Sequence, residues 1–155
     1  FKLYPWEWMM NELFAYNIKN DEINANWIEP AWKMILSNKA ILPILWELYP
    51  DHPLLLEAYT DSPKEMKNYV KKPLLSREGA NVEVVKSGAI SEQTSGEYGE
   101  EGFIYQALAN LHHEETGYTI IGSWIIGQES CGITFRESDQ FITTDKSRFV
   151  PHIIE

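Results

Sequence analysis

The spacing of the apolar residues changes partway along the chain, and this change restricts the folds that the chain can adopt. Up to about Pro63, apolar residues recur at intervals of three and four, which is the spacing of an amphipathic helix. Beyond Pro63 the apolar stretches are short and often β-branched, which is typical of strands. The sequence therefore predicts an α+β fold in which helices are followed by a largely antiparallel sheet.

Three stretches are expected to be helical, namely residues 5–16, residues 39–46 and a short stretch near residues 54–59. Pro5 suits the first turn of the first helix, because proline is tolerated where a helix leaves its N–H groups unbonded. Ser37 or Asn38 can cap the second helix. The polar residues 17–26 are expected to form a loop.

Six short strands are predicted after these helices, at residues 69–75, 82–85, 103–108, 119–126, 131–136 and 141–144. Residues 127–130 and 137–140 have the length and composition of hairpin turns. Short turns join strands that run in opposite directions, so the sheet is expected to be largely antiparallel.

The composition excludes several classes of protein. The 155 residues suffice for one domain with a proper core, and 44% are hydrophobic, so the chain is neither a disordered tail nor a membrane protein. A formal charge of -10 argues against nonspecific binding to nucleic acid. The single cysteine, Cys131, can form no internal disulfide, so we expect a cytoplasmic protein and a buried structural thiol.

The charges are unevenly distributed along the chain. Residues 64–86 contain six basic and three acidic side chains, whereas residues 87–115 contain six acidic side chains and no lysine or arginine. This pattern fits a small anionic ligand held by one basic loop, and it also fits an ordinary solvated face.

Both ends of the chain read as interior sequence. The chain opens on Phe1 without an initiator methionine, and it closes on an apolar stretch before Glu155. We therefore expect residues 1–155 to be a portion of a longer chain.

The segment from Tyr69 to Asn81 carries the sharpest chemical pattern. Side chains alternate along a strand, so Lys71 and Lys72 point to opposite faces and one of them can enter a cleft. The loop that follows holds Arg77 and Gly79, and a lysine beside a loop arginine is what a polyphosphate site needs. The alternative is a surface hairpin with solvated lysines.

Four segments together resemble the glutathionylspermidine synthase family: residues 69–81, 37–43, 102–108 and 136–152. The resemblance covers nearly the whole chain, in order, and it is closest to bacterial members described as acid–amine ligases. It implies an ATP-grasp-like fold and places the chain in the C-terminal portion of the family's synthetase domain, which would be incomplete at its N-terminal side.

The resemblance implies a role for individual residues. Lys39 and Lys72 match nucleotide-contacting lysines, and Gly79 matches a loop glycine that allows close approach. The hinge strand that would read the adenine edge matches Gln106, Ala107 and Leu108, and Lys146 is a looser match among the nucleotide contacts. The catalytic arginines of the family match Arg77, near the transferred phosphate, and Arg136, which would steady the acyl phosphate.

The implied activity is ATP-dependent formation of an amide from a carboxylate, such as that of a peptide, and an amine. Nucleic acid and membrane are not implied as partners, and the carboxylates that bind Mg²⁺ in the family lie upstream of this chain. Known members carry glycine in place of Ser76 and cysteine in place of Glu78, which leaves the substrates open. The alternative function is a nucleotide-binding relative or scaffold that has lost turnover, and the isolated chain is expected to be inactive.

Other conspicuous residues receive structural interpretations. The six tryptophans are expected to pack in the core rather than to stack on bases. His112 and His113 adjoin two glutamates, but neighbouring residues in a turn rarely converge on one metal ion, so no metal site is predicted in this chain.

Overall fold

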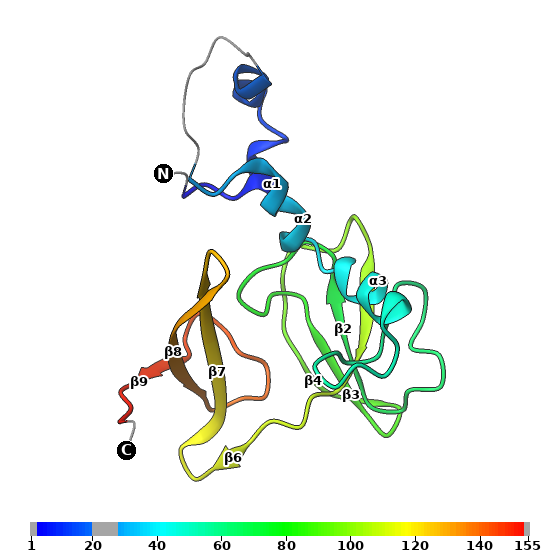
Figure 1. Ribbon diagram of the computed structural model, residues 1–155. Coiled ribbons are helices and arrows are strands. Elements are labelled where there is room, and N and C mark those ends of the chain that lie inside the picture. The colour runs from blue at the N-terminus through cyan, green and yellow to red at the C-terminus, as the bar shows by residue number, and fades with distance from the viewer. Residues whose placement is uncertain (1–2, 20–27, 154–155) are drawn as a thin grey trace.

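The computed structural model describes residues 3–19 and 28–153, which form two antiparallel sheets and a few short helices (Figure 1). The helices are α1 (Trp6–Met9), η1 (Leu13–Lys19), η2 (Ala31–Lys33), α2 (Met34–Ser37) and α3 (Ile41–Leu48), of which η1 and η2 are 3₁₀ helices. The strands are β1 (Ala58–Tyr59), β2 (Tyr69–Pro73), β3 (Glu83–Lys86), β4 (Ala89–Gln93), β5 (Phe103–Ala107), β6 (His113–Glu114), β7 (Gly117–Ile126), β8 (Glu129–Ser138) and β9 (Arg148–Val150). The α+β prediction is therefore confirmed.

The five-stranded sheet has the order β1-β5-β2-β3-β4, and the four-stranded sheet has the order β6-β7-β8-β9. The two sheets lie beside each other, and the N-terminal segment with α1 and α2 lies at one end of the molecule (Figure 1). None of the helices within residues 3–19 and 28–153 has the length and apolarity needed to cross a bilayer.

The first predicted helix is interrupted. α1 ends at Met9, because the side-chain Nδ2 of Asn11 donates to the carbonyl of Glu7, which the Asn11 N–H would use in a continuous α-helix. The Asn11 N–H donates to Trp8 instead, and the chain continues as η1. The loop expected at residues 17–26 is therefore wrong for residues 17–19, and its remainder lies outside the described residues.

The second predicted helix is confirmed as α3, shifted by two residues. Asn38 Oδ1 accepts a hydrogen bond from the Ala40 N–H just before it, as a capping side chain does. The preceding short helices η2 and α2 were not predicted, because no capping residue or long apolar period marks them.

Five of the six predicted strands are present, as β2, β3, β5, β7 and β8, and the β7–β8 turn falls at residues 127–128. The helix expected near residues 54–59 is wrong: this segment ends in β1, because β5 pairs with it and the Ala107 N–H donates to the Glu57 carbonyl. The turn expected at residues 137–140 is also wrong at its start, since β8 continues to Ser138.

The strand expected at residues 141–144 is absent. Both carboxylate oxygens of Glu92 on β4 accept backbone N–H groups here, from Phe141 at 3.2 Å and from Ile142 at 2.9 Å. The two N–H groups are thus occupied by a side chain and cannot enter a β-ladder. The contact ties the connection between β8 and β9 to the five-stranded sheet.

Most of the buried apolar residues form two clusters, and Ala58, Val85 and Ile104 are buried outside them. The first joins the five-stranded sheet to the 141–142 segment, with Val70, Val82, Val84 and Ile142 at its centre and Leu108 and Phe141 against it. The second lies in the N-terminal segment, where Trp6, Met9 and Ala15 pack with Ile18 and Met34.

The β7–β8 hairpin carries exposed apolar side chains. Its residues Ile121, Trp124, Ile125 and Ile126 are each more than half exposed. Cys131 on β8 is exposed too, so the prediction of a buried thiol is wrong: no layer of the described chain covers this part of the hairpin.

The prediction that the tryptophans pack in the core holds fully for Trp6, and Trp46 is only partly buried. Trp8, Trp32 and Trp124 are exposed by 43%, 62% and 59%, and Trp27 lies outside the described residues. Trp6 lies on the face of α1 that packs in the second cluster together with Met9, whereas Trp8 on the same helix is not part of that cluster.

Candidate functional site

The register of the five-stranded sheet places Lys72 and Gln106 on one face. Val70 of β2 lies opposite Gln106 of β5 and opposite Val84 of β3. Side chains two residues apart on a strand share a face, so Lys72 projects on the same side as Val70. This face lines a cavity of about 300 Å³ that we call the lysine cavity.

The walls of the lysine cavity come from segments far apart in the sequence. Its polar residues are Lys39, Lys72, Ser76, Glu78, Gln106 and Thr143, and its other lining residues are Leu56, Val70, Gly79, Val82, Val84, Ala107, Ala109, Phe141 and Ile142. The cavity thus combines two ammonium groups with largely apolar walls. Five of the predicted site residues meet here: Lys39, Lys72, Gly79, Gln106 and Ala107.

The Lys72 ammonium is partly buried and is bonded to an amide rather than to a carboxylate. Its Nζ donates to Oε1 of Gln106 over 2.7 Å. Burial and, as the smaller cause, the positive charge of Lys39 together lower the pKa of Lys72 to about 8. The charge of Lys72 is therefore poorly neutralised by the described part of the protein.

Lys39 sits just before α3 and is held to the loop that follows β2. Its Nζ donates to the carbonyl of Ser76 at 2.8 Å and to the Ser76 hydroxyl at 2.9 Å, and its N–H donates to the Leu74 carbonyl. Burial lowers the pKa of Lys39, the nearby Glu7 carboxylate opposes this change, and Arg77 adds to it. The start of α3 and the end of β2 thereby place Lys39 and Lys72 in the same cavity.

Lys71 lies on the other face of β2, as the alternation predicts. Its Nζ is 3.0 Å from Oε1 of Glu83, directly across the strand pair, and 4.5 Å from the centre of the Phe103 ring. Lys71 is therefore neutralised within the sheet, and the predicted division between the two lysines is confirmed.

The hinge strand is only partly available to a ligand. The Ala107 N–H donates to the Glu57 carbonyl at 2.8 Å, and the Leu108 N–H donates to the Asn68 carbonyl at 3.2 Å. Leu108 packs against the first apolar cluster and is not among the lining residues of the lysine cavity, whereas Ala109 is. These two N–H groups are engaged within the protein rather than left open for an adenine edge.

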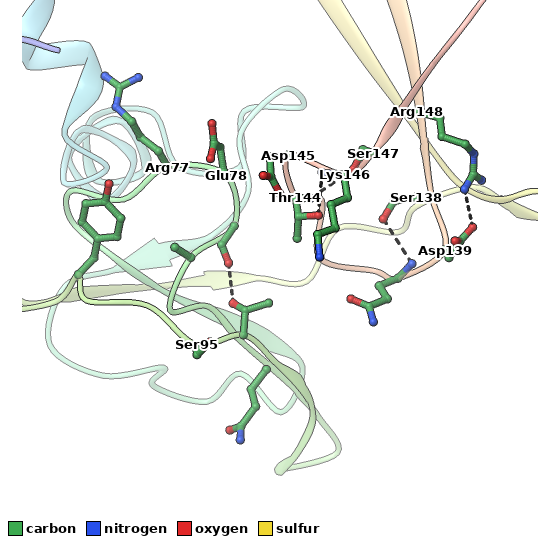
Figure 2. A pocket seen from close by; sticks show the side chains of 16 residues that line it. Arg77, Glu78, Ser95, Ser138, Asp139, Thr144, Asp145, Lys146, Ser147 and Arg148 are labelled. Atoms are coloured by element: carbon green, nitrogen blue, oxygen red, sulfur yellow. Dashed lines mark hydrogen bonds and ion pairs between the residues drawn. The ribbon is translucent and has the colours of Figure 1, made fainter. Parts of the chain in front are cut away.

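Two further cavities adjoin the lysine cavity at the loop after β2. The first, the loop cavity, has about 700 Å³ and lies between the residues around Arg77 and the turn that carries Lys146 (Figure 2). The second, the arginine cavity, has about 460 Å³ and is lined by Arg136 and Phe149. Glu78 and Gly79 line all three, so the predicted site residues other than Leu108 surround one loop.

Gly79 is required by its backbone and by its neighbours. Its φ is +70°, and a Cβ atom at this position would lie 2.5 Å from the carbonyl oxygen of Thr143 and 2.9 Å from a methyl carbon of Ile142. Only glycine fits this approach without strain. The glycine predicted to admit a ligand thus also lets the loop pack against the connection between β8 and β9.

Arg77 does not line the lysine cavity. Its Nη2 is 2.7 Å and its Nε 2.9 Å from Oε1 of Glu7 in α1. Figure 2 shows its side chain extending away from the turn of Lys146, toward a helix. The sequence singles out Arg77 but offers no signal for its partner, which lies 70 residues away.

The wall formed by Phe141, Ile142 and Thr143 was not predicted from the sequence. These residues were assigned to a strand, whereas the Glu92 carboxylate holds them as a connection over the cavity. Phe141 and Ile142 lie 49 and 50 positions after Glu92, and no local sequence pattern reveals a contact over such a separation.

The histidine pair makes a local contact only. His112 Nε2 is 2.7 Å from Oε1 of Glu114, and the His113 ring packs on Tyr118. Within residues 3–19 and 28–153, no three His, Cys, Asp or Glu side chains gather as they would around a metal ion.

Comparisons with known proteins place the chain in a family. The family model described as "Glutathionylspermidine synthase preATP-grasp" matches residues 1–155. A protein of Haemophilus influenzae named "Putative acid–amine ligase" is 45% identical over 98% of this chain. Trypanothione synthetase of Crithidia fasciculata is 39% identical over 79% of the chain, and the bifunctional glutathionylspermidine synthetase/amidase of Escherichia coli is 33% identical over 81%.

The chain spans 40% of the length of the Haemophilus protein, 19% of the Crithidia protein and 21% of the Escherichia coli protein. The family match covers the whole chain, and these relatives carry ligase or synthetase names. The chain therefore belongs to the glutathionylspermidine synthase family.

Proposed function

We propose that the full-length protein is an ATP-dependent acid–amine ligase and that the lysine cavity holds the nucleotide. The observation that carries this proposal is the pair of ammonium groups of Lys39 and Lys72, which line one cavity and are hydrogen-bonded to neutral groups of the described chain. Such unneutralised cations bind phosphate oxygens strongly.

The shape and lining of the cavity support a nucleotide rather than a free phosphate. A volume of about 300 Å³ is at the lower end of the range for small-molecule sites, and the valines and Ile142 supply apolar surfaces for a planar base. Gln106 adds a carboxamide that can pair with the edge of the base. We assign Lys39, Lys72, Gln106, Ala107 and, through its backbone, Gly79 to this ligand, with Lys146 in the neighbouring loop cavity.

The proposed reaction has two steps. A carboxylate oxygen of the acid attacks the γ-phosphorus and ADP leaves, which yields an acyl phosphate. The amine nitrogen then attacks the acyl carbon, loses its proton, and releases inorganic phosphate. Arg77 and Arg136 would stabilise the negative charge of these steps, because fixed cations are most effective where charge develops.

Mg²⁺ would neutralise and orient the phosphates of the nucleotide. The family resemblance assigns its carboxylate ligands to residues upstream of this chain. We accordingly assign residues 1–155 to the C-terminal portion of an ATP-grasp synthetase domain, and we expect the isolated chain to release no ADP with any acid and amine. The names of the relatives support a carboxylic acid and an amine as substrates.

Calorimetric titration of the full-length protein with ATP tests this assignment, with Lys72→Ala compared with Lys71→Ala. The loss of a charge-assisted contact of about 1.5 to 3 kcal/mol should weaken ATP binding by roughly ten- to over a hundredfold in Lys72→Ala. Lys71→Ala is a matched control, because Lys71 pairs with Glu83 on the opposite face. Equal ATP affinities for the two variants would refute the placement of the phosphates.

A further inference from the structure

We propose that Glu7 is an internal counter-ion of Arg77, and that an anionic group of the bound nucleotide takes the place of the Glu7 carboxylate. The inference rests on the proposed function, because it takes ATP as the anionic ligand. The Glu7 carboxylate of the N-terminal segment then competes directly with the ligand for the Arg77 guanidinium group.

The first support is the geometry of the ion pair. Arg77 directs two donors, Nε and Nη2, at the single oxygen Oε1 of Glu7, over 2.9 Å and 2.7 Å. A nucleotide phosphate offers oxygens of the same charge to the same donors. The donor set that Glu7 occupies is therefore the one that Arg77 would use for a phosphate.

The second support is the incomplete bonding of the Glu7 carboxylate. Its side chain is only 9% exposed, and its other oxygen, Oε2, is buried without a hydrogen-bond partner in the described part of the chain. A buried carboxylate oxygen that lacks a donor costs free energy. The contact is thus bonded at one oxygen only, which makes it easier for a ligand to replace.

The third support is the arrangement of charges along the site. Arg77 lowers the pKa of Lys39, and Lys39 in turn lowers that of Lys72, so Lys39 is repelled by the cations on both sides of it. The Glu7 carboxylate acts in the opposite direction on Lys39. A negative charge at the Arg77 end therefore favours the cation cluster, whether it comes from Glu7 or from a phosphate.

The position of Arg77 supports replacement over a shared contact. Arg77 lines the loop cavity but not the lysine cavity, and its side chain extends toward a helix (Figure 2). The loop that carries Arg77 also carries Ser76, the partner of Lys39. A turn of the Arg77 side chain toward the phosphates of a bound nucleotide requires it to leave Glu7.

The test is ATP titration of the full-length protein with the variant Glu7→Gln, which keeps the shape of the side chain and removes its charge. Binding should become about three- to tenfold tighter, because a partly buried ion pair no longer has to be broken. Glu12→Gln, in the same segment and bonded to Tyr4, should leave ATP affinity unchanged and controls for general charge effects. Thermal unfolding checks that each variant is folded, and Glu7→Ala provides a second variant with the same expected direction.

The double variant Arg77→Ala/Glu7→Gln distinguishes replacement of Glu7 at Arg77 from simple repulsion between the Glu7 charge and ATP. Compared with Arg77→Ala alone, it should show little further gain, because Glu7 has no guanidinium left to occupy. An equal gain in both backgrounds, or weaker binding by Glu7→Gln, would overturn the inference while ATP binding itself stands. If neither the unmodified protein nor Glu7→Gln binds ATP, the inference and the proposed function both fail.

Discussion

The ammonium of Lys72 donates to the carboxamide oxygen of Gln106, over 2.7 Å, between neighbouring strands of the five-stranded sheet. This contact provides a neutral acceptor for a charge that burial has partly removed from water. It leaves the positive charge in place, so Gln106 stabilises the free protein and, on the proposed function, preserves the attraction of Lys72 for an anion. The pair therefore links stability and binding.

Replacement of Gln106 by Leu should destabilise the protein. The substitution removes the acceptor of the Lys72 ammonium, and the loss of a hydrogen bond to a charged group costs about 1 to 3 kcal/mol. Chemical denaturation measures this change. Gln93→Leu is the matched control, because Gln93 is exposed at the end of β4, and its effect should stay within about 0.5 kcal/mol. Equal effects would argue against the importance of the pair.

The pH dependence of ATP binding should reflect Lys72. Its pKa in the free protein is lowered to about 8, and a bound anion raises it again because it favours the charged form. Affinity should change little between about pH 7 and 8, and fall above pH 8 by at most about tenfold per pH unit. Lys72→Arg keeps its charge over this range, so a titration series with this variant should lose the decline.

The stability of the free protein should change in the opposite direction over the same range. The folded-state pKa of Lys72 lies below its ordinary value of 10.5, so the unfolded chain binds more protons between these values. The contribution of Lys72 to the free energy of unfolding therefore rises with pH from about 8 to 10.5.

Gly79→Ala should destabilise the protein more than a substitution at another glycine of similar conformation. An alanine with φ near +70° costs about 1 kcal/mol, and the approach of its Cβ to Thr143 should add about 1 to 3 kcal/mol. Gly88 has a φ of +79° and no atom within 4 Å of an added Cβ, so Gly88→Ala carries only the first cost. The difference between their unfolding free energies measures the packing of the loop against the 142–143 backbone.

Loss of Arg136 should distinguish a ligase from a relative that only binds nucleotide. If Arg136 stabilises the acyl phosphate, Arg136→Ala should lower ADP release by the full-length protein by about a hundred- to a thousandfold and change ATP affinity little. Arg136→Lys should recover part of the rate. The assay uses glutathione-like peptides with polyamines. Equal rates for the unmodified protein and Arg136→Ala would exclude the catalytic role, and no ADP release with any pair would favour the inactive relative.

The parts of the site that depend on local order could be predicted from the sequence. Alternation along β2 separates Lys71 from Lys72, and both prove to have the expected faces, one paired with Glu83 and the other lining a cavity. The close backbone approach that Gly79 allows is likewise a property of one residue in one loop, although its partner Thr143 could not be predicted. Such features need no knowledge of distant segments.

Most of the features that could not be predicted depend on contacts between distant residues. Glu92 reaches Phe141 and Ile142 across some 50 positions, and it turns an apparent strand into a connection over the cavity. Glu7 reaches Arg77 across 70 positions, and no local pattern reveals this ion pair. The first helix failed for a local reason, since Asn11 competes for a backbone carbonyl, and the periodicity of apolar residues does not register such competition.

The hydrogen bonds of Glu92 with Phe141 and Ile142 determine when the lysine cavity can form during synthesis of the chain. Residues 39 to 109, which supply most of its lining, leave the ribosome before residues 141 to 143, which supply its last wall. The five-stranded sheet can thus form first, with both lysines facing water and little desolvation of their charges. If the lysine cavity holds the nucleotide as proposed, we expect the nascent chain to gain its full affinity for an anion late, when the Ile142 N–H donates to the Glu92 carboxylate on β4.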